Sequence, residues 1–175
     1  FKIPQKEFKK ELLSVSDINS SLSNVISLIK VNNPKAFIIT TVSPVRHLKN
    51  GFVDNNLSKA HLITAIHQVL SSESLLKTLF YFPSYEIMMD ELRDYRFYKE
   101  DMIHPNNTAV NIIWEAFNKA WISSETVPLQ KAILAIQSSL EHKPFNPNSE
   151  DHLLFIRDLE TKISLIKKDV PHIKF

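Results

Sequence analysis

The chain has 175 residues, of which 43% are hydrophobic, and its formal net charge is +2. This length is that of about one domain, and the apolar content is enough to bury a real core. Acidic and basic residues are mixed, so the basic face that nucleic acid or an anionic membrane requires is missing, and we expect neither partner. The sequence has no cysteine, which excludes a disulfide scaffold, a thiolate zinc site and a cysteine nucleophile.

Two further absences narrow the class of protein. Gly51 is the only glycine, where average usage would give about a dozen, so a P-loop, a dinucleotide fingerprint and a G-x-S-x-G elbow are excluded. No apolar run reaches the roughly 20 residues that span a bilayer, and the charged N-terminal segment is unlike a signal peptide. We therefore expect a soluble protein, with the cytoplasm favoured among locations. Because the chain begins at Phe1 and not at methionine, we expect it to belong to a longer protein.

The first predicted elements are a helix and a buried strand. Ser16 or Asp17 can cap a helix that ends before residues 32–34. Residues 36–42, AFIITTV, form a continuous β-branched run, which is typical of a strand covered on both faces in a parallel sheet. The helix is predicted from apolar residues at spacings of three and four, namely Ile18, Leu22, Val25, Ile26 and Ile29.

A second helix and a second strand complete a crossover unit. Helical spacing runs from residue 56 or 57 to residue 70, the strand LFYF covers residues 79–82, and residues 85–92 are again helical. A strand, a helix and a strand in this order form a right-handed crossover, so the predicted fold class is α/β. His61 and His67 lie about 120° apart around the second helix and cannot share a metal ion. We expect no metal site.

The segment after residue 94 contains the candidate catalytic pair. Asp101 and His104 lie three residues apart in a loop, and the following residues open a helix with Val110, Ile113, Trp114 and Phe117 on one stripe. A carboxylate at this distance from an imidazole can orient a histidine general base, although a lone D-x-x-H also occurs by chance. Trp114 and Trp121 lie seven residues apart on this helix, and we expect both in the core.

The loop after the first strand is a second candidate site. In open α/β sheets, ligands bind beyond the carboxyl ends of the strands, where the Ser43-to-His47 loop lies. Arg46 and His47 could bind an anionic substrate group or stabilise an oxyanion; the alternative is a surface turn with Arg46 in an ion pair. Ser43 and Ser84 each follow a strand and could act as nucleophiles, but both also suit a turn.

The C-terminal part has a different pattern. We place a boundary near Ser123, with an α/β domain over residues 1–122 and a helical hairpin over residues 123–175. The two amphipathic helices are joined by the loop at residues 142–149. Their stripes consist of Leu129, Ala132, Ile133, Ile136 and Leu140, and of Leu153, Ile156, Leu159, Ile163 and Ile166.

Several long motifs together resemble one family. The segments TVSPVRHLKNGF, NNLSKAHL, YFPSYEIMMDELRDYRFY and DMIHP, with FKIPQKEF and HKPFNPNSEDH near the ends, are similar to the GSCFA domain family. That family is itself similar to the SGNH/GDSL hydrolases. The resemblance implies a flavodoxin-like three-layer fold with a parallel sheet, no cofactor, and an ester hydrolase or acyltransferase with a Ser-His-Asp type site.

The resemblance also leaves part of the site outside this sequence. The D-x-x-H block matches at Asp101 and His104, whereas the G-S-C-F-A motif that supplies the serine, and a G-x-N-D block, are absent. We therefore expect the serine upstream and an incomplete sheet, whose uncovered surface would favour a homo-oligomer. The expected substrate is a small-molecule or glycan-linked acyl ester, and the Ser43, Arg46 and His47 loop would bind it. The alternative is a non-catalytic binding or assembly module that retains the fold.

Overall fold

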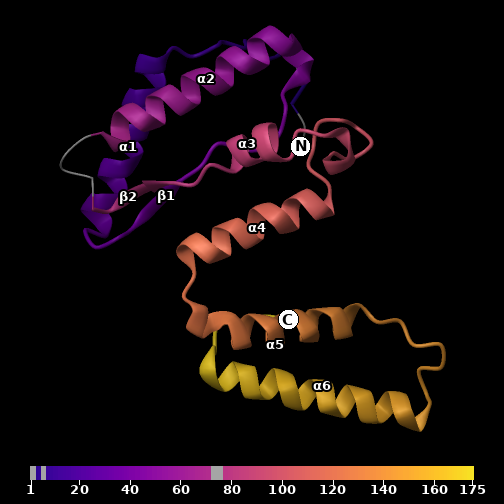
Figure 1. Ribbon diagram of the computed structural model, residues 1–175. Helices are drawn as coiled ribbons and strands as arrows, with labels where there is room; N and C mark the ends of the chain where they lie inside the picture. The colour runs from indigo at the N-terminus through magenta and orange to yellow at the C-terminus, as the bar shows by residue number, and fades with distance from the viewer. Residues whose placement is uncertain (1–2, 5–6, 72–76) are drawn as a thin grey trace. The chain divides into compact units, whose positions relative to one another are not determined.

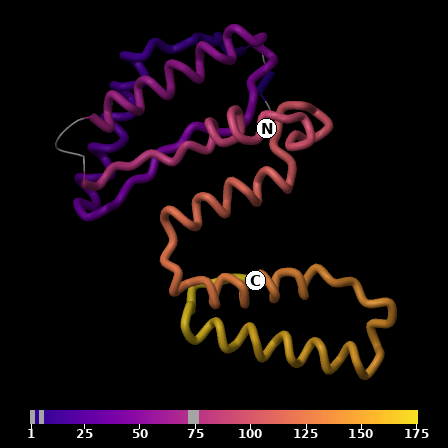
Figure 2. The backbone as a smooth tube through the Cα atoms, in the orientation of Figure 1, coloured from indigo at the N-terminus to yellow at the C-terminus, as the bar shows by residue number. Residues whose placement is uncertain are grey.

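The computed structural model describes residues 3–4, 7–71 and 77–175, and the chain divides into two compact units, Phe1–Phe117 and Asn118–Phe175. The described residues contain six α-helices and one two-stranded parallel sheet, so the protein is mixed α/β and mostly helical. Figures 1 and 2 show the path of the backbone. Within the described ranges, no helix combines the length and apolar content that crossing a bilayer requires.

The first helix is α1 (Val15–Asn32), and it begins slightly earlier than predicted. Its cap is Ser14 rather than Ser16 or Asp17: the Ser14 hydroxyl accepts from the Asp17 N–H at 3.2 Å, and the Asp17 carboxylate accepts from the Ser14 N–H at 3.1 Å. This reciprocal pair is a capping box, which satisfies backbone donors at the helix start. Asp17 therefore belongs to the first turn of the helix.

The sheet confirms the predicted pairing of parallel neighbours. β1 (Ile38–Thr40) pairs with β2 (Leu79–Tyr81), and Ile38 lies opposite Leu79. One face packs against α1 and α2, where Leu79 joins Ile26 and Val69 in a buried cluster. The prediction that β1 is covered on both faces was wrong for the described structure, because Ile39 on the other face is 37% exposed.

The helix α2 (Gly51–Leu70) starts five or more residues before the predicted position. A 3-10 turn (Leu48–Asn50) precedes it, and Gly51 follows with φ of 83°, a conformation that only glycine adopts without steric cost. Figure 1 shows α1 and α2 on one side of the sheet, and the two helices pack against each other. The single glycine of the chain thus allows the turn from the Ser43-to-His47 loop into α2.

The segment after β2 contains the buried cluster next to the candidate site. α3 (Ser84–Glu86) continues into a π-helical turn (Ile87–Glu91), and a 3-10 turn (Tyr95–Phe97) follows. The next helix, α4 (Asn107–Trp121), lies on the opposite side of the sheet from α1 and α2 (Figure 1), and its Phe117 ring contacts Phe82 edge-on at 5.1 Å. The core expectation was wrong for Trp114, which is 51% exposed. The buried cluster of this segment consists of Met88, Leu92, Tyr98 and Ala109.

The second unit is the predicted helical hairpin. A 3-10 turn (Ser124–Thr126) leads into α5 (Val127–Glu141), and α6 (Glu150–Asp169) begins after its cap residue Ser149. The boundary predicted near Ser123 lies between α4 and this 3-10 turn, whereas the compact units divide after Phe117. The two helices pack on each other through a core of Ile136, Leu159 and Ile166.

Candidate active site

The loop that carries Asp101 and His104 is closed at its base by backbone hydrogen bonds. Tyr98 and Pro105 form an antiparallel bridge, and the Lys99 N–H donates to the His104 carbonyl at 2.8 Å. The buried Tyr98 ring anchors this base in the cluster of Met88, Leu92 and Ala109. The loop therefore projects from a fixed stem at the start of α4.

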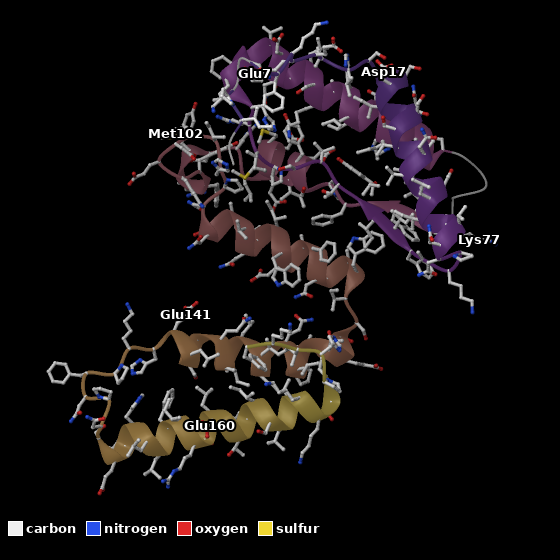
Figure 3. The ribbon with its side chains drawn as sticks, turned by 180° about the vertical axis from the view of Figure 1, so that it is seen from behind. Glu7, Asp17, Lys77, Met102, Glu141 and Glu160 are labelled. Atoms are coloured by element: carbon white, nitrogen blue, oxygen red, sulfur yellow. The ribbon has the colours of Figure 1, made fainter. Side chains whose placement is uncertain are left out.

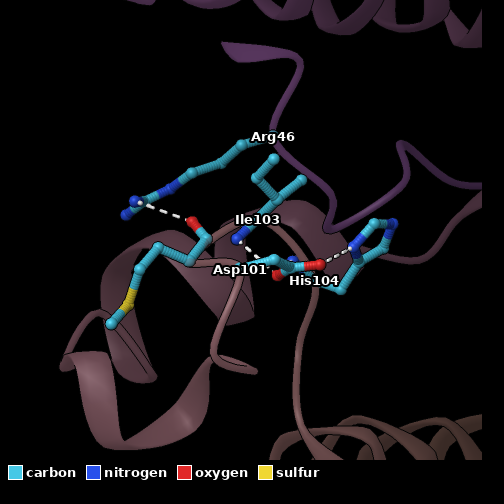
Figure 4. Close-up of polar contacts among 5 residues, drawn as sticks. Arg46, Asp101, Ile103 and His104 are labelled. Carbon is cyan, nitrogen blue, oxygen red and sulfur yellow. Dashed lines mark hydrogen bonds and ion pairs between the residues drawn. The ribbon is translucent and has the colours of Figure 1, made fainter. Parts of the chain in front are cut away.

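The Asp101 carboxylate binds both the loop backbone and the His104 ring (Figure 4). Oδ2 lies 2.6 Å from His104 Nδ1, while Oδ1 accepts from the N–H groups of Ile103 at 2.9 Å and His104 at 3.0 Å. The predicted contact between carboxylate and imidazole is thus present. With the proton on Nδ1, the other ring nitrogen, Nε2, presents a lone pair, and the side chain is 52% exposed. This is the orientation that a general base requires.

The three hydrogen bonds also determine the ionisation of Asp101. They lower the pKa of its carboxyl group from 3.8 to about 2, chiefly through the His104 backbone N–H and then through the His104 side chain. A carboxylate that accepts several N–H bonds is stabilised in its charged form. Asp101 therefore stays ionised beside the imidazole throughout the neutral range.

Met102 gives the loop its shape. Its φ of 56° lies in the left-handed region, which a residue with a side chain enters at a cost of about 1–2 kcal/mol. This turn reverses the chain between Asp101 and Ile103, so that the next two N–H groups point back at the Asp101 carboxylate. The Met102 side chain, labelled in Figure 3, is 45% exposed. Backbone strain of this kind is common at functional sites.

Arg46 joins the Ser43-to-His47 loop to the loop of Asp101 and His104. Its backbone N–H donates to the Ile103 carbonyl at 3.3 Å, and its Nη1 donates to the Met102 carbonyl at 3.4 Å. The guanidinium group lies 4.3 Å from the centre of the Tyr98 ring, in a cation–π contact. The alternative of an Arg46 ion pair is not observed in the part of the chain that the structure describes, where Arg46 contacts no carboxylate.

The other predicted site residues have different environments. The Ser43 side chain is exposed, and His47 is exposed with its backbone N–H bound to the Asn55 amide oxygen at 2.7 Å. Ser84 is buried, donates to the Val42 carbonyl at 2.7 Å, and lies 2.7 Å from the Thr41 hydroxyl. Because its hydrogen bonds are satisfied in the interior, Ser84 serves to join the ends of the two strands. Among the described residues, neither Ser43 nor Ser84 contacts the His104 ring, so the structure assigns neither as its nucleophile.

Two buried polar residues of α2 contact the same loop, and sequence reasoning missed both. Lys59 is 3% exposed and donates from Nζ to the Ser43 carbonyl at 2.8 Å; burial lowers its pKa. Asn55 is 5% exposed and binds His47 as described above. Their position in the sequence could have identified both residues, because spacings of three and four place Asn55 and Lys59 on the same inward helix face as Ile66. The predicted helix begins at residue 56 or 57 and therefore excludes Asn55, whereas α2 begins at Gly51.

An apolar hollow lies beside the loop of Asp101 and His104. Its volume is about 420 Å³, and Pro105, the residue after His104, lines it together with Pro44 from the Ser43-to-His47 loop. None of its lining residues is charged. Most of the surface comes from the open face of the sheet and from α4, through Ile39, Phe82, Val110, Ile113, Trp114 and Phe117.

Comparisons with known proteins agree with the motifs on which this site is built. A model of the GSCFA family matches residues 1–117, and a model of the C-terminal domain of GSCFA domain proteins matches residues 133–175. No curated protein and no solved structure shows a significant match. Because the first match alone covers more than half of the sequence and includes the Asp101–His104 loop, the chain belongs to the GSCFA family.

Proposed function

We propose that this chain is part of an SGNH-like ester hydrolase or acyltransferase, in which Asp101 and His104 act on a serine supplied by residues upstream. The observation that carries the proposal is the 2.6 Å contact between Asp101 Oδ2 and His104 Nδ1, with an exposed imidazole beyond it. The parallel β1–β2 pair supports a sheet of the flavodoxin-like type. The remaining strands and the third layer of that fold would come from the same upstream residues.

The proposed reaction uses the pair as base and orienting group. His104 Nε2 takes the proton of the serine hydroxyl as the serine oxygen attacks the ester carbonyl carbon, and Asp101 holds the ring and stabilises the imidazolium. The imidazolium then gives that proton to the leaving alcohol, which leaves an acyl-serine. Water, or the hydroxyl group of an acceptor, then attacks the carbonyl carbon of the acyl-serine. His104 takes the proton of the attacking group and gives it to the serine oxygen, and the acyl group is released. These two outcomes distinguish a hydrolase from an acyltransferase.

The Ser43, Arg46 and His47 loop is the proposed binding site for the substrate. Arg46 has a guanidinium group that contacts aromatic rings and a carbonyl but no carboxylate among the described residues, so its charge is available to an anionic or developing negative group. His47 is exposed next to it. A small-molecule or glycan-linked acyl ester fits this arrangement, because its carbonyl oxygen becomes negative in the transition state.

The test compares the longer protein, carrying the upstream serine segment, with its His104→Ala variant on a small aryl ester. Turnover should fall by about 10³-fold or more, as it does for members of such triads. The matched control is His172→Ala, which removes an exposed histidine of the second unit. Equal turnover with and without His104 would show that the loop is structural and would reject the proposed mechanism.

The second candidate is a non-catalytic binding or assembly module that retains the fold. The observation that favours it is the uncharged apolar hollow on the open face of the sheet, since exposed apolar surfaces of this kind mark interaction sites. A longer protein that has the serine but shows no turnover on esters of any chain length would support this candidate. Measurable turnover that depends on His104 would reject it.

A further inference from the structure

Asn55 and Lys59 are polar, yet they occupy inward positions of α2. They are 5% and 3% exposed, in line with the buried residues Ile66 and Val69 on the same helix face. A lysine is almost never fully buried without a partner, because removing its ammonium group from water is costly. Apolar side chains would fill these two positions at lower cost. Their polar groups therefore need a role other than packing.

The two side chains bind opposite ends of one short loop. Lys59 Nζ donates to the Ser43 carbonyl at 2.8 Å, and its ammonium group lies 5.1 Å from the centre of the Tyr85 ring. Asn55 Oδ1 accepts from the His47 backbone N–H at 2.7 Å. Arg46 lies between these two attachment points. Its backbone position is therefore fixed from both sides by α2.

Arg46 in turn binds the two peptide groups that orient Asp101 (Figure 4). The Met102 carbonyl accepts from Arg46 Nη1, and the Ile103 N–H of the same peptide group donates to Asp101 Oδ1. The next peptide group repeats this pattern: the Ile103 carbonyl accepts from the Arg46 N–H, and the His104 N–H donates to Asp101 Oδ1. Hydrogen bonds in series strengthen one another. Both peptide groups are held on one side by Arg46 and on the other by Asp101.

We propose that Asn55 and Lys59 are positioning residues for the Asp101–His104 pair, acting through Arg46 and these two peptide groups. The catalytic meaning of this positioning rests on the proposed function above, but the positioning itself does not. Removing either side chain releases one end of the Ser43-to-His47 loop. Arg46 then no longer fixes the Met102 and Ile103 carbonyls, and Asp101 loses the rigid donors that set its contact with His104.

The experiment measures the geometry of the loop directly by NMR, without turnover. Lys59→Met keeps most of the side-chain volume and removes the donor, and Asn55→Ala removes the acceptor. Both should speed the hydrogen exchange of the Ile103 and His104 amides by about tenfold, the cost of one hydrogen bond, and should weaken the Nδ1–H signal of His104. Asn55→Asp keeps an acceptor for the His47 N–H and should restore both signals.

The matched control is Ile66→Ala on the same helix. This change leaves a cavity and destabilises the unit, but it removes no contact to the loop. The proposal is overturned if Lys59→Met and Asn55→Ala affect the Ile103 and His104 amides no more than Ile66→Ala does. If Lys59→Met does not fold, Asn55→Ala and its rescue by Asn55→Asp decide the question. If the variants affect the loop as expected but the longer protein that carries the serine shows no ester turnover, the proposed function is rejected and this positioning is retained.

Discussion

One carboxylate organises the candidate site at the level of single residues. Asp101 uses one oxygen for two backbone N–H groups and the other oxygen for the His104 ring. The backbone bonds determine where the carboxylate lies, and the remaining oxygen determines which nitrogen of the imidazole carries the proton. The shape of the loop and the tautomer of His104 are consequently set by the same group.

The low pKa of Asp101 predicts how the loop responds to acid. The pKa is about 2 in the folded loop and is raised to the ordinary 3.8 when the contacts are lost, so the folded loop is favoured wherever the carboxyl group is ionised. The stabilisation is complete at about pH 5 and above and is lost progressively as the pH falls through the folded pKa of about 2. NMR of the Ile103 and His104 amides should show this change. Asp101→Asn, which does not titrate, should remove it, and a loop that opens at the same pH in that variant would contradict the assignment.

At the level of elements, the spacing of apolar residues predicted the helices and strands. It did not predict which polar residues are buried. Residues 36–42 and 79–82 predicted parallel neighbours because they are short, apolar and separated by a helical segment, and the sheet has this pairing. The predicted start of α2 was five or more residues too late, whereas in the structure Gly51, with its φ of 83°, joins the 3-10 turn to the helix. Lys59 was missed because a lysine in a helix normally faces water.

The candidate site, like the fold, was predictable only in part from the sequence. The spacing of Asp101 and His104 predicted their contact, because residues three apart in a tight loop can face one another. The role of Arg46 was not predictable, since its partners are backbone carbonyls and the Tyr98 ring rather than a charged side chain. A sequence does not show which backbone carbonyls accept hydrogen bonds from side chains. The bonds that unite the two loops therefore appear only in the structure.

The open edge and face of the sheet predict self-association of this chain. In the described residues β1 pairs with β2 alone, and Ile39 of β1 lines the uncharged hollow. Two copies can therefore meet there without repulsion between like charges. Light scattering should show a mass that rises with concentration towards that of a dimer.

Variants at this surface test the assignment. Ile39→Lys and Trp114→Lys place charges at the hollow and should keep the chain monomeric, as charges on edge strands do. Leu134→Lys is the control, because Leu134 is 61% exposed in the second unit. A wild-type chain that stays monomeric at millimolar concentration would show that the surface does not bind a second copy.

At the level of the whole molecule, the two units have separate cores. Met88, Leu92, Tyr98 and Ala109 belong to the first, and Ile136, Leu159 and Ile166 belong to the second. Each core is formed by residues of its own unit alone. Stability of the second unit therefore depends on the contact between α5 and α6.

Ile136→Ala tests this separation. Ile136 is 2% exposed, and its truncation should destabilise the second unit by about 2–5 kcal/mol, the usual cost of such a cavity. The unfolding free energy reported by hydrogen exchange should fall for amides of α5 and α6. The amides of Ile103 and Phe82, which donate to Asp101 and Thr40, serve as the control and should keep their protection. A parallel loss in both units would mean that they unfold as one.

The closed stem of the loop from residue 98 to residue 105 also bears on the order of folding. Its bridge and the bond from Lys99 to His104 join residues close in sequence, whereas the sheet joins residues such as Thr40 and Phe80, which are 40 positions apart. Short chain closures lose less entropy and form faster than distant ones. In pulsed hydrogen exchange during refolding, the Lys99 and Asn106 amides should become protected before the Phe82 amide, which donates to Thr40. During refolding, the contact between Asp101 and His104 would then form before the sheet.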